Sequence, residues 1–340
     1  MIRPGAPTLE DVARAAQVST ATVSRCLNSP ERVVEATRLR VLAAVDRLGY
    51  SPNFGARALA ARRTDTIGAI IPTMENSIFA RGIQAFQEEL RAHKLTLLIA
   101  SSSYRPDQEA DQIRTLTARG AAGFLLIGHD RNSEIYSFLK RQGVPVLVAW
   151  VYDPNNPQPS IGFDNRSSMR ALAARVIELG HRDIAMISAG QAFNDRARDR
   201  VSGVRDAMEL SGLEPQSLRL METTYGIESG ADAFSALMAA ETRPTVVMCG
   251  NDVLAAGALK RARQMKLRVP EDISITGFDD IELARLLEPA LTTVHVPHRE
   301  MGRQAARMLV DMVEGGAPQA SIELQTTLQM RDTLGPPRTV

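Results

Sequence analysis

Residues 19–28, which read STATVSRCLN, combine short hydroxyl side chains with one arginine, a set that suits contact with nucleic acid. Hydroxyls can bind phosphate oxygens, threonine and alanine methyls can contact thymine, and arginine can bind guanine through two parallel hydrogen bonds. Val23, Cys26 and Leu27 fall on one helical face. Ser19 can cap that helix at its start. This chemistry requires a short helix whose polar face is free to enter a DNA major groove.

The flanking residues predict the elements that would position this helix. Residues 9–16 repeat apolar side chains at i, i+3, i+4 and i+7, the spacing of one helix face. Thr8 and Asp11 have the spacing of a capping box at its start. Two short helices bury little surface alone, and a third apolar helix is expected over residues 34–48, ending at Gly49. Together these segments predict a helix-turn-helix unit with a supporting helix.

Composition sets the broad class of the protein. A chain of 340 residues exceeds one compact domain, so two or three units are expected. Residues 1–64 contain ten arginines, no lysine and five acidic residues, whereas the remainder has 30 basic and 34 acidic residues. A basic head on a slightly acidic body suits nucleic-acid contact at one end.

Compartment and cofactor expectations follow from the same sequence. The two distant cysteines suggest a reduced, cytoplasmic protein and no disulfide framework. The start of the sequence has no apolar signal region, and no apolar run approaches the ~18 residues of a membrane span. His295 and His298 are separated by Pro297, which argues against a helical pair of metal ligands. We therefore expect no metal, no other cofactor and no membrane contact.

From Thr66 onward, apolar strand patterns alternate with amphipathic helices. Expected strands are 67–71, 95–100, 123–127, 144–149, 184–188, 218–221, 246–249 and 273–276. Expected helices are 79–93, 107–119, 169–179, 199–211, 229–239 and 254–265. Repeated strand–helix units indicate parallel sheets covered on both faces. Two such series predict two doubly wound subdomains, with a ligand cleft at the carboxyl ends of their strands.

Several motifs give the chain a resemblance to a known family. These are residues 9–28, LGYSPN at 48–53, ARAL at 56–59, NSIFA at 76–80, GFDN at 162–165, LGHR at 179–182, ND at 251–252, GFDD at 277–280 and EPALTTV at 288–294. Together they resemble the lactose-repressor/purine-repressor family of bacterial transcription regulators. That resemblance implies a periplasmic-binding-protein-like body entered by three crossings between its subdomains, near 161–165, 292–296 and 322–327.

The resemblance implies a division into head, hinge and body. The head would span residues 1–51, the hinge 52–65 and the body 66–340. The N-subdomain would then comprise about 66–162 and 293–322, and the C-subdomain about 163–292 and 323–340.

The resemblance also implies roles for the head residues. Thr20, Ala21 and Arg25 match positions that reach base edges. Phosphate contacts or helix caps are implied for Ser19, Thr22, Ser24 and Asn28. A small helical bundle used for protein contact is the alternative, and Cys26 is expected to be a small core residue.

The hinge, residues 52–65, is implied to form a helix that orders on operator DNA beside its twin in a dimer. Leu59 matches the family leucine that enters a base step from the minor groove. The alternative is a passive tether, and Gly55 would weaken the free helix. The tail at 335–338 has no leucine heptad, so we expect a homodimer without a tetramerising helix.

For the body, the resemblance implies that Ile78 and Phe79 form an apolar wall of the effector site. Arg200 matches the arginine that holds the effector, and Asn251 and Asp279 match groups that accept ligand hydroxyls. The alternative for Arg200 is a surface ion pair with Asp199 or Asp206. The alternative for Asp279 is a cap on the helix starting at Ile281.

Trp150, the only tryptophan, stands where many relatives have an aspartate. Loss of a carboxylate beside Arg200 favours an acidic ligand, although Trp150 can equally fill core. The loop at 101–105 adds hydroxyls, but similar loops in relatives often face solvent. GFDN at 162–165 and PHREMG at 297–302 look most like regulators that respond to gluconate or 2-ketogluconate.

We therefore expect a cytoplasmic, DNA-binding repressor of sugar-acid utilisation, released from its operator by a sugar-acid effector. A corepressor-type regulator that binds a neutral sugar or purine is the first alternative. A solute-binding protein without DNA function is the second. No catalytic residues are expected, because no phosphate-binding loop, nucleophile elbow or Ser/His/Asp set is evident.

Overall fold

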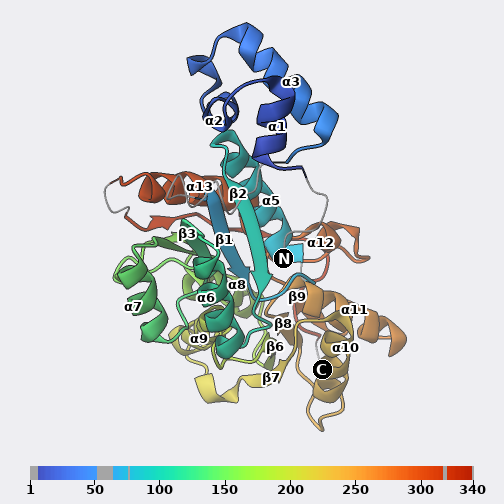
Figure 1. Ribbon diagram of the computed structural model, residues 1–340. Coiled ribbons are helices and arrows are strands. Elements are labelled where there is room, and N and C mark those ends of the chain that lie inside the picture. Colours follow the sequence, from blue (N-terminus) through green and yellow to red (C-terminus); the bar gives the residue numbers. More distant parts are fainter. Residues whose placement is uncertain (1–6, 52–63, 76, 317–319, 339–340) are drawn as a thin grey trace. The chain divides into compact units, whose positions relative to one another are not determined.

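The computed structural model describes residues 7–51, 64–75, 77–316 and 320–338 (Figure 1). These residues form two compact units, Met1–Thr64 and Asp65–Val340, which are treated separately below as the head and the body. The predicted hinge helix and its leucine, Leu59, lie outside the described residues.

The described residues of the head form three α-helices and one short 3-10 helix: α1 (Leu9–Ala16), α2 (Thr20–Asn28), η1 (Pro30–Arg32) and α3 (Glu35–Leu48). The predicted capping box is present, because the Asp11 amide donates to Thr8 Oγ1 at 3.2 Å and the Thr8 amide donates to the Asp11 carboxylate at 2.9 Å. Gly49 ends α3 with a φ of 62°, which a residue without a Cβ adopts freely. The helices predicted for the head are thus confirmed.

The core of the head is small and consists of short apolar side chains. It contains Val12, Ala13, Ala16, Val23, Cys26, Val41 and Ala44. Not every apolar side chain of α3 packs inward, since Leu39 and Leu42 are exposed. Val41 and Ala44, which lie three residues apart, are buried, and Val45 and Leu48 pack against the same core.

The body contains two parallel sheets, as predicted. The larger has the strand order β11-β5-β4-β3-β1-β2, and the smaller has the order β7-β6-β8-β9. The larger comprises β1 (Thr66–Ile71), β2 (Thr96–Ser101), β3 (Gly123–Ile127), β4 (Val146–Ala149), β5 (Ser160–Gly162) and β11 (Ile322–Glu323). The smaller comprises β6 (Ile184–Ala189), β7 (Arg219–Thr223), β8 (Val246–Cys249) and β9 (Ser274–Thr276). Strands such as β1, β3 and β6 are buried along their full length because helices cover both faces.

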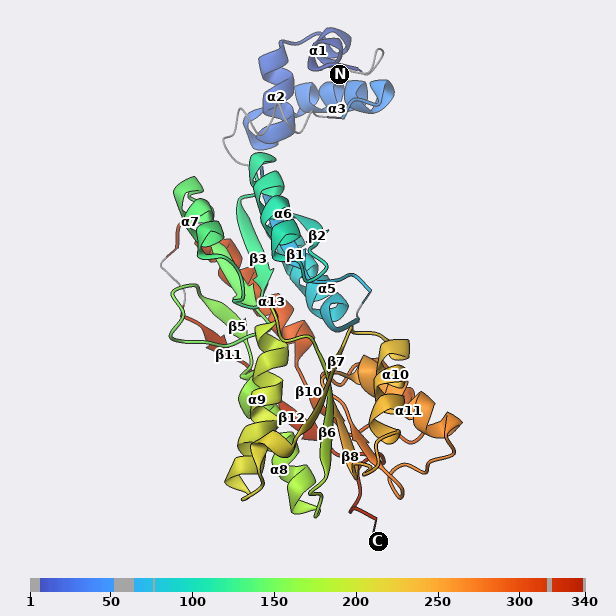
Figure 2. The same cartoon turned by 90° about the horizontal axis from the view of Figure 1, so that it is seen from below.

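Helices cover both faces of each sheet (Figure 2). Around the larger sheet lie α5 (Ser77–Ala92), α6 (Pro106–Ala118), α7 (Ser133–Gln142) and α13 (His298–Val313). Around the smaller lie α8 (Asn165–Glu178), α9 (Asp195–Leu210), α10 (Ile227–Met238) and α11 (Asp252–Gln264), with α12 (Glu282–Leu286) beside α11. The packed pairs are α5 with α13, α8 with α9, and α10 with α11.

Three segments join the two sheets, which lie end to end in Figure 2. The first leads from β5 into α8. The second contains β10 (Thr293–His295), which pairs antiparallel with β12 (Thr327–Gln329). The third leads from β11, which pairs with β5, to β12. We call the part around the larger sheet the N-subdomain and the part around the smaller sheet the C-subdomain.

Polar contacts also link the two subdomains beside the cleft. Arg198 on α9 donates to both carboxylate oxygens of Asp130, which follows β3, at 2.8 and 2.9 Å. Nearby, the His129 amide donates to Asp195. Across the body, Arg81 on α5 donates to Glu282 on α12. The Asp130–Arg198 pair, here called the latch, thus connects a loop of one subdomain to a helix of the other.

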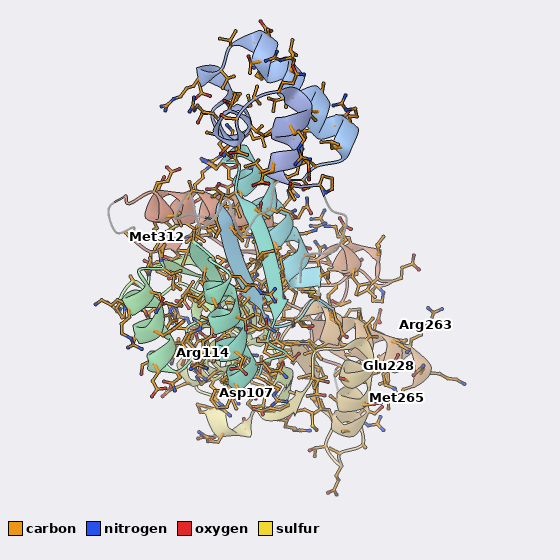
Figure 3. The ribbon with its side chains drawn as sticks, viewed as in Figure 1. Asp107, Arg114, Glu228, Arg263, Met265 and Met312 are labelled. Carbon is orange, nitrogen blue, oxygen red and sulfur yellow. The ribbon has the colours of Figure 1, made fainter. Side chains whose placement is uncertain are left out.

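The outer faces of the helices are polar. Figure 3 labels Asp107 and Arg114 on α6, whose side chains are largely exposed, and Arg263 near the end of α11. Within the described ranges, no helix is long and apolar enough to cross a membrane.

Candidate functional site

In the head, α2 presents a polar face. Thr20, Ala21 and Arg25 are exposed, and Ala21 and Arg25 lie one turn apart on the same side. Val23 and Cys26 are buried on the opposite side, where α2 packs on the head core. This helix therefore holds its three predicted base-contacting residues toward solvent.

The other predicted DNA-contacting residues fix the local geometry of α2. The Thr22 amide donates to the Ser19 hydroxyl at 3.1 Å, so Ser19 caps the helix as predicted. The two hydroxyls of Ser19 and Thr22 lie 2.9 Å apart, and Asn28 donates to Ser24 at 3.2 Å. These contacts leave hydroxyl oxygens at both ends of α2 that can also bind DNA phosphates.

In the body, Arg200 lies at the centre of a buried polar cluster. Its Nε donates to Asn165 at 2.9 Å and its Nη1 donates to the Gly250 carbonyl at 2.6 Å. Its guanidinium carbon lies 3.8 Å from the ring centroid of Phe278, and its Nη2 is 3.6 Å from Asp279. The surface ion pair proposed as the alternative role of Arg200 is wrong, because the residue is only 4% exposed.

Asp279 follows β9 and is fully buried. Its backbone φ is 105°, a strained value for a residue with a Cβ. Neither of its carboxylate oxygens has a hydrogen-bond partner among the described residues. Burial raises the pKa of this carboxyl to about 6, while Arg200 and Arg196 oppose the rise.

Asp279 does not cap α12, which was the alternative role expected for it. The residue before that helix, Ile281, caps it without a side-chain hydrogen bond. The Ile281 amide instead donates to Asp252 at 2.8 Å. The carboxylate of Asp279 is therefore left for another partner.

Trp150 and Phe79 form the aromatic wall of the cluster. Their ring centroids are 5.3 Å apart in an edge-to-face arrangement. Trp150 is buried, as its core-filling alternative expected, yet its indole N–H has no hydrogen-bond partner within the described chain. Ile78 is buried beside Phe79 at the start of α5. Trp150 thus both packs and offers a donor.

His298, at the start of α13, belongs to this cluster, although sequence reasoning gave it no role in ligand binding. Its ring centroid lies 6.2 Å from that of Trp150, and its Nε2 lies 3.8 Å from the Asp279 carboxylate. Burial, followed by the charge of Arg200, lowers its pKa to about 3, so the ring is neutral. The PHREMG motif marked this position in the sequence, but spacing alone did not connect it to Asp279.

Asn251 has a structural role in addition to its predicted one. Its side-chain oxygen accepts from the Leu254 amide at 2.9 Å and caps α11. Its Nδ2 is buried and unpaired among the described residues. Asn251 can therefore donate to a ligand, and its oxygen, which already accepts one hydrogen bond, has a second lone pair for the acceptor role expected from the sequence.

Beside this cluster, a cleft of about 580 Å³ opens between the subdomains. It is lined by Thr73, Met74, Glu75, Ser101, Ser103, Tyr104, Ala189, Gly190, Ala192, Asn194, Thr223, Thr224 and Tyr225. Three residues of the loop at 101–105, Ser101, Ser103 and Tyr104, thus line this cleft, and Ser103 is also exposed. The cleft lies at the carboxyl ends of β1, β2, β6 and β7, as expected for open parallel sheets.

The cluster and cleft are suited to binding. Buried donors and acceptors without protein partners are satisfied when a polar ligand supplies the missing groups. Across the described part of the chain, no group of three or more His, Cys, Asp or Glu side chains is placed to hold a metal ion.

Comparison with known proteins gives matches to both units. Residues 8–53 match the family described as bacterial regulatory proteins, lacI family, and residues 173–334 match the periplasmic binding protein-like domain. Catabolite control protein A of Priestia megaterium is 31% identical over 93% of this chain and 95% of its own length. The transcriptional repressor PurR of Vibrio campbellii is 32% identical over 96% and 98%, respectively.

Among solved structures, the lac repressor dimer bound to its operator and an anti-inducer has a TM-score of 0.83 and 25% identity. The alignment covers 97% of this chain and 99% of that one.

Proposed function

Because the chain belongs to the lacI family of bacterial regulatory proteins, we propose that it is a transcriptional repressor that a small effector releases from a palindromic operator. The observation that carries this proposal is a pairing of two features in one chain. The head exposes a polar helix face, and the body buries a polar cluster whose groups lack partners among the described residues.

Operator recognition is assigned to α2. Arg25 is exposed on the face that also holds Thr20 and Ala21, and an arginine that binds guanine bidentately distinguishes one base pair. Arg25→Ala should weaken operator binding by ~1–3 kcal/mol and relax specificity at one position per half-site. The matched control is Arg14→Ala on α1, which removes the same charge from another helix of the head.

The DNA-binding experiment selects a site from random DNA and then footprints it. A symmetric footprint of about 14–20 bp is expected, because a two-fold dimer mirrors its operator. An asymmetric footprint at saturating protein would contradict the dimer. An Arg25 variant with unchanged base preferences would remove this residue from recognition.

We assign a sugar acid of the gluconate or 2-ketogluconate class as the effector. Arg200 supports this choice because its planar guanidinium suits a carboxylate, and Trp150 adds no competing negative charge. Asp279 favours a ligand that also carries hydroxyl groups, since its oxygens can accept hydrogen bonds and have no hydrogen-bond partner among the described residues. A neutral sugar is the second candidate, because Arg200 is already engaged by Asn165 and Gly250.

The effector experiment is a calorimetric titration of the full chain with gluconate, 2-ketogluconate, ribose, galactose and a purine. Tight binding of either acid, with weak binding of the others, is the expected result. Preferential binding of ribose or galactose would establish the neutral-sugar alternative. Binding of the purine alone would reject the sugar-acid class.

For the switch, we propose that effector binding closes the cleft and changes the spacing of the hinges in the dimer. A helix as short as the one predicted for the hinge would not persist alone, so separated hinges, with Leu59, would lose their minor-groove contact. Effector binding should then weaken operator binding by ~1–3 kcal/mol, and operator binding should weaken effector binding by the same amount. Operator affinity measured with and without effector tests the sign: tighter binding with effector would make the protein a corepressor system.

A further inference from the structure

We propose that Asp280 couples the effector site to operator binding, because its carboxylate links the loop at 278–281, here called the effector loop, to both β10 and β12. This inference rests on the proposed function, in which the neighbouring residue Asp279 contacts the effector. Asp280 is thus a positioning residue that acts through its neighbour and does not itself bind the ligand.

The carboxylate of Asp280 is buried and contacts three basic side chains. Its Oδ1 accepts a hydrogen bond from Arg331 Nη2 at 2.6 Å. Its Oδ2 accepts from Arg285 Nη2 at 3.2 Å and lies 2.9 Å from His295 Nδ1. Burial alone would raise the pKa of this carboxyl, but these hydrogen bonds hold the pKa below its usual value. The group is therefore ionised at neutral pH, and because its side chain is only 1% exposed, salt screens these contacts little.

Two of these three partners belong to the strands that cross between the subdomains. His295 is the last residue of β10, and Arg331 follows β12. These two strands pair antiparallel (Figure 2). Arg331 Nη1 also donates to the Leu291 carbonyl at 2.8 Å, just before β10. One carboxylate therefore contacts both the second and the third of the segments that join the two sheets.

The backbone of the effector loop is attached to β10 as well. The Asp279 amide donates to the Val294 carbonyl at 2.9 Å. The Ile281 amide donates to Asp252, whose other carboxylate oxygen accepts from the Thr293 hydroxyl at 2.6 Å. Because several hydrogen bonds join them, the effector loop and β10 should move as one piece.

The two successive aspartates of the effector loop have different surroundings. The carboxylate of Asp279 lies 3.6 Å from Arg200 and 3.8 Å from His298, in the buried cluster, whereas that of Asp280 lies among the crossing strands. Their φ values of 105° and 52° are positive, a conformation that surrounding contacts must hold in residues with a Cβ. A ligand that shifts Asp279 must therefore also shift its neighbour.

The first crossing segment contacts the same cluster through Asn165, which begins α8. Its Oδ1 accepts from Arg200 Nε at 2.9 Å, and its Nδ2 donates to the Trp150 carbonyl at 3.0 Å. Arg200 is thus joined to the first crossing, and Asp279 is joined through Asp280 to the other two. A ligand that bridges Arg200 and Asp279 would act on all three crossings.

The experiment measures effector affinity and operator affinity in the full chain, first separately and then together. The parent is titrated with gluconate, 2-ketogluconate, ribose, galactose and a purine, and operator affinity is measured with and without each compound. A bound effector should change operator affinity in the parent by about five- to 150-fold. Asp280→Asn should leave both separate affinities within about twofold of the parent and reduce this change to less than about twofold, because the amide loses the ionic contacts with the crossings.

His295→Ala and Arg285→Ala separate coupling from stability. Each removes one partner of the same carboxylate oxygen, and both side chains are substantially exposed, at 40% and 64%, so both variants should fold. His295 lies on β10, whereas Arg285 lies on α12, outside the crossings. His295→Ala should therefore reduce the response of operator binding to effector, and Arg285→Ala should leave it at the parental value. Asp206→Asn is the matched charge control, since it breaks an ion pair with Arg166 inside the C-subdomain.

A parental response in Asp280→Asn, or equal responses in His295→Ala and Arg285→Ala, would overturn the coupling role. Effector affinity lost together with the response in Asp280→Asn would also overturn it, because Asp280 would then belong to the binding site. If effector tightens operator binding in the parent and Asp280→Asn removes that effect, the release mechanism is wrong and the coupling role stands. If no compound changes operator affinity in the parent, the proposed function fails and this inference fails with it.

Discussion

Arg200 combines structural and recognition roles in one side chain. It joins Asn165, Gly250 and Asp279, and it stacks on Phe278. Arg200→Ala should lower effector affinity by about 1.5–3 kcal/mol, the usual contribution of a hydrogen bond to a charged group. Operator affinity should stay near that of the parent, because the head forms a separate unit.

Arg200→Lys provides the control for this prediction, since it keeps the charge and loses the planar fork. Thermal unfolding of both variants separates loss of recognition from loss of body stability. An Arg200→Ala protein that still releases operator at parental effector concentrations would exclude Arg200 from effector binding.

The pKa of Asp279 makes effector binding depend on pH. At pH values above about 6 this carboxyl is ionised and repels a ligand carboxylate placed at Arg200. Below that pH it is protonated and the repulsion disappears. Gluconate affinity should therefore fall by up to about tenfold per pH unit above pH 6 and level off below it.

Calorimetry between pH 5.5 and 8 measures this dependence, with Asp279→Asn as the variant in which it should vanish. A neutral sugar that donates hydroxyl hydrogens to Asp279 should show the opposite trend, because its acceptor is lost in acid. A gluconate affinity independent of pH would place the ligand carboxylate away from Asp279.

Individual residues were predicted with uneven success. Arg200 and Asp279 were singled out from matching positions and Trp150 from its departure from the family pattern, and the structure brings them together around a buried site. His298 and Tyr104 received no such role, because their positions depend on how α13 and the loop after β2 pack. Neither local periodicity nor motif spacing contains that information.

At the scale of elements, Gly128 lies where the two subdomains approach. It follows β3 with a φ of 72°, and a Cβ added there would lie 1.9 Å from Arg196 Nη1 and 2.4 Å from Asp195. Gly128→Ala should weaken this contact and destabilise the body by ~1–3 kcal/mol. It should also lower effector affinity, since the latch residue Asp130 is two positions away.

Gly143→Ala is a matched control, because Gly143 has a similar φ of 66° and nothing within 4 Å of an added Cβ. Both variants then carry similar backbone strain, but only in Gly128→Ala does the added Cβ collide with neighbouring side chains. Equal effects of the two substitutions on effector affinity would show that strain alone is responsible.

Most helices and strands could be predicted because their apolar periodicity is strong. The elements that were missed are α7, α13 and the short strands at the crossings. For example, β11 has two residues and β5 has three, too few for a period to be recognised. These strands exist because long-range pairing, such as β11 with β5, supplies their hydrogen bonds.

At the scale of the whole molecule, we expect the predicted homodimer to form at an edge of the larger sheet. β2 is its last strand, and Leu98 and Ile99 on this strand are 36% and 41% exposed. An exposed apolar strand at the edge of a sheet tends to pair with another chain unless something covers it. Ile99→Asp should therefore give monomers in light scattering and weaken binding to a two-site operator.

The matched control is Leu210→Asp at the end of α9, which places the same charge on another exposed leucine. If Ile99→Asp remains dimeric while operator binding is intact, the dimer uses another surface. A stable tetramer of the parent at micromolar concentration would contradict the predicted homodimer.

The overall architecture was predictable because two series of strand–helix units leave few arrangements. The effector was not, because its identity depends on the placement of a few polar atoms. The Arg200–Asp279 separation of 3.6 Å, and the lack of hydrogen-bond partners for the Asp279 oxygens among the described residues, arise only when folding brings together residues that are far apart in the sequence.

The latch between Asp130 and Arg198 affects how long an effector stays bound rather than how tightly it binds. If a ligand is enclosed behind the latch, the two hydrogen bonds from Arg198 to Asp130 must break before the ligand leaves. The latch would therefore lengthen the residence time of the effector. Because both side chains are partly exposed, added salt should speed that release. Stopped-flow dissociation at increasing ionic strength measures this effect, which would set how long the effector acts on the repressor after free effector is removed.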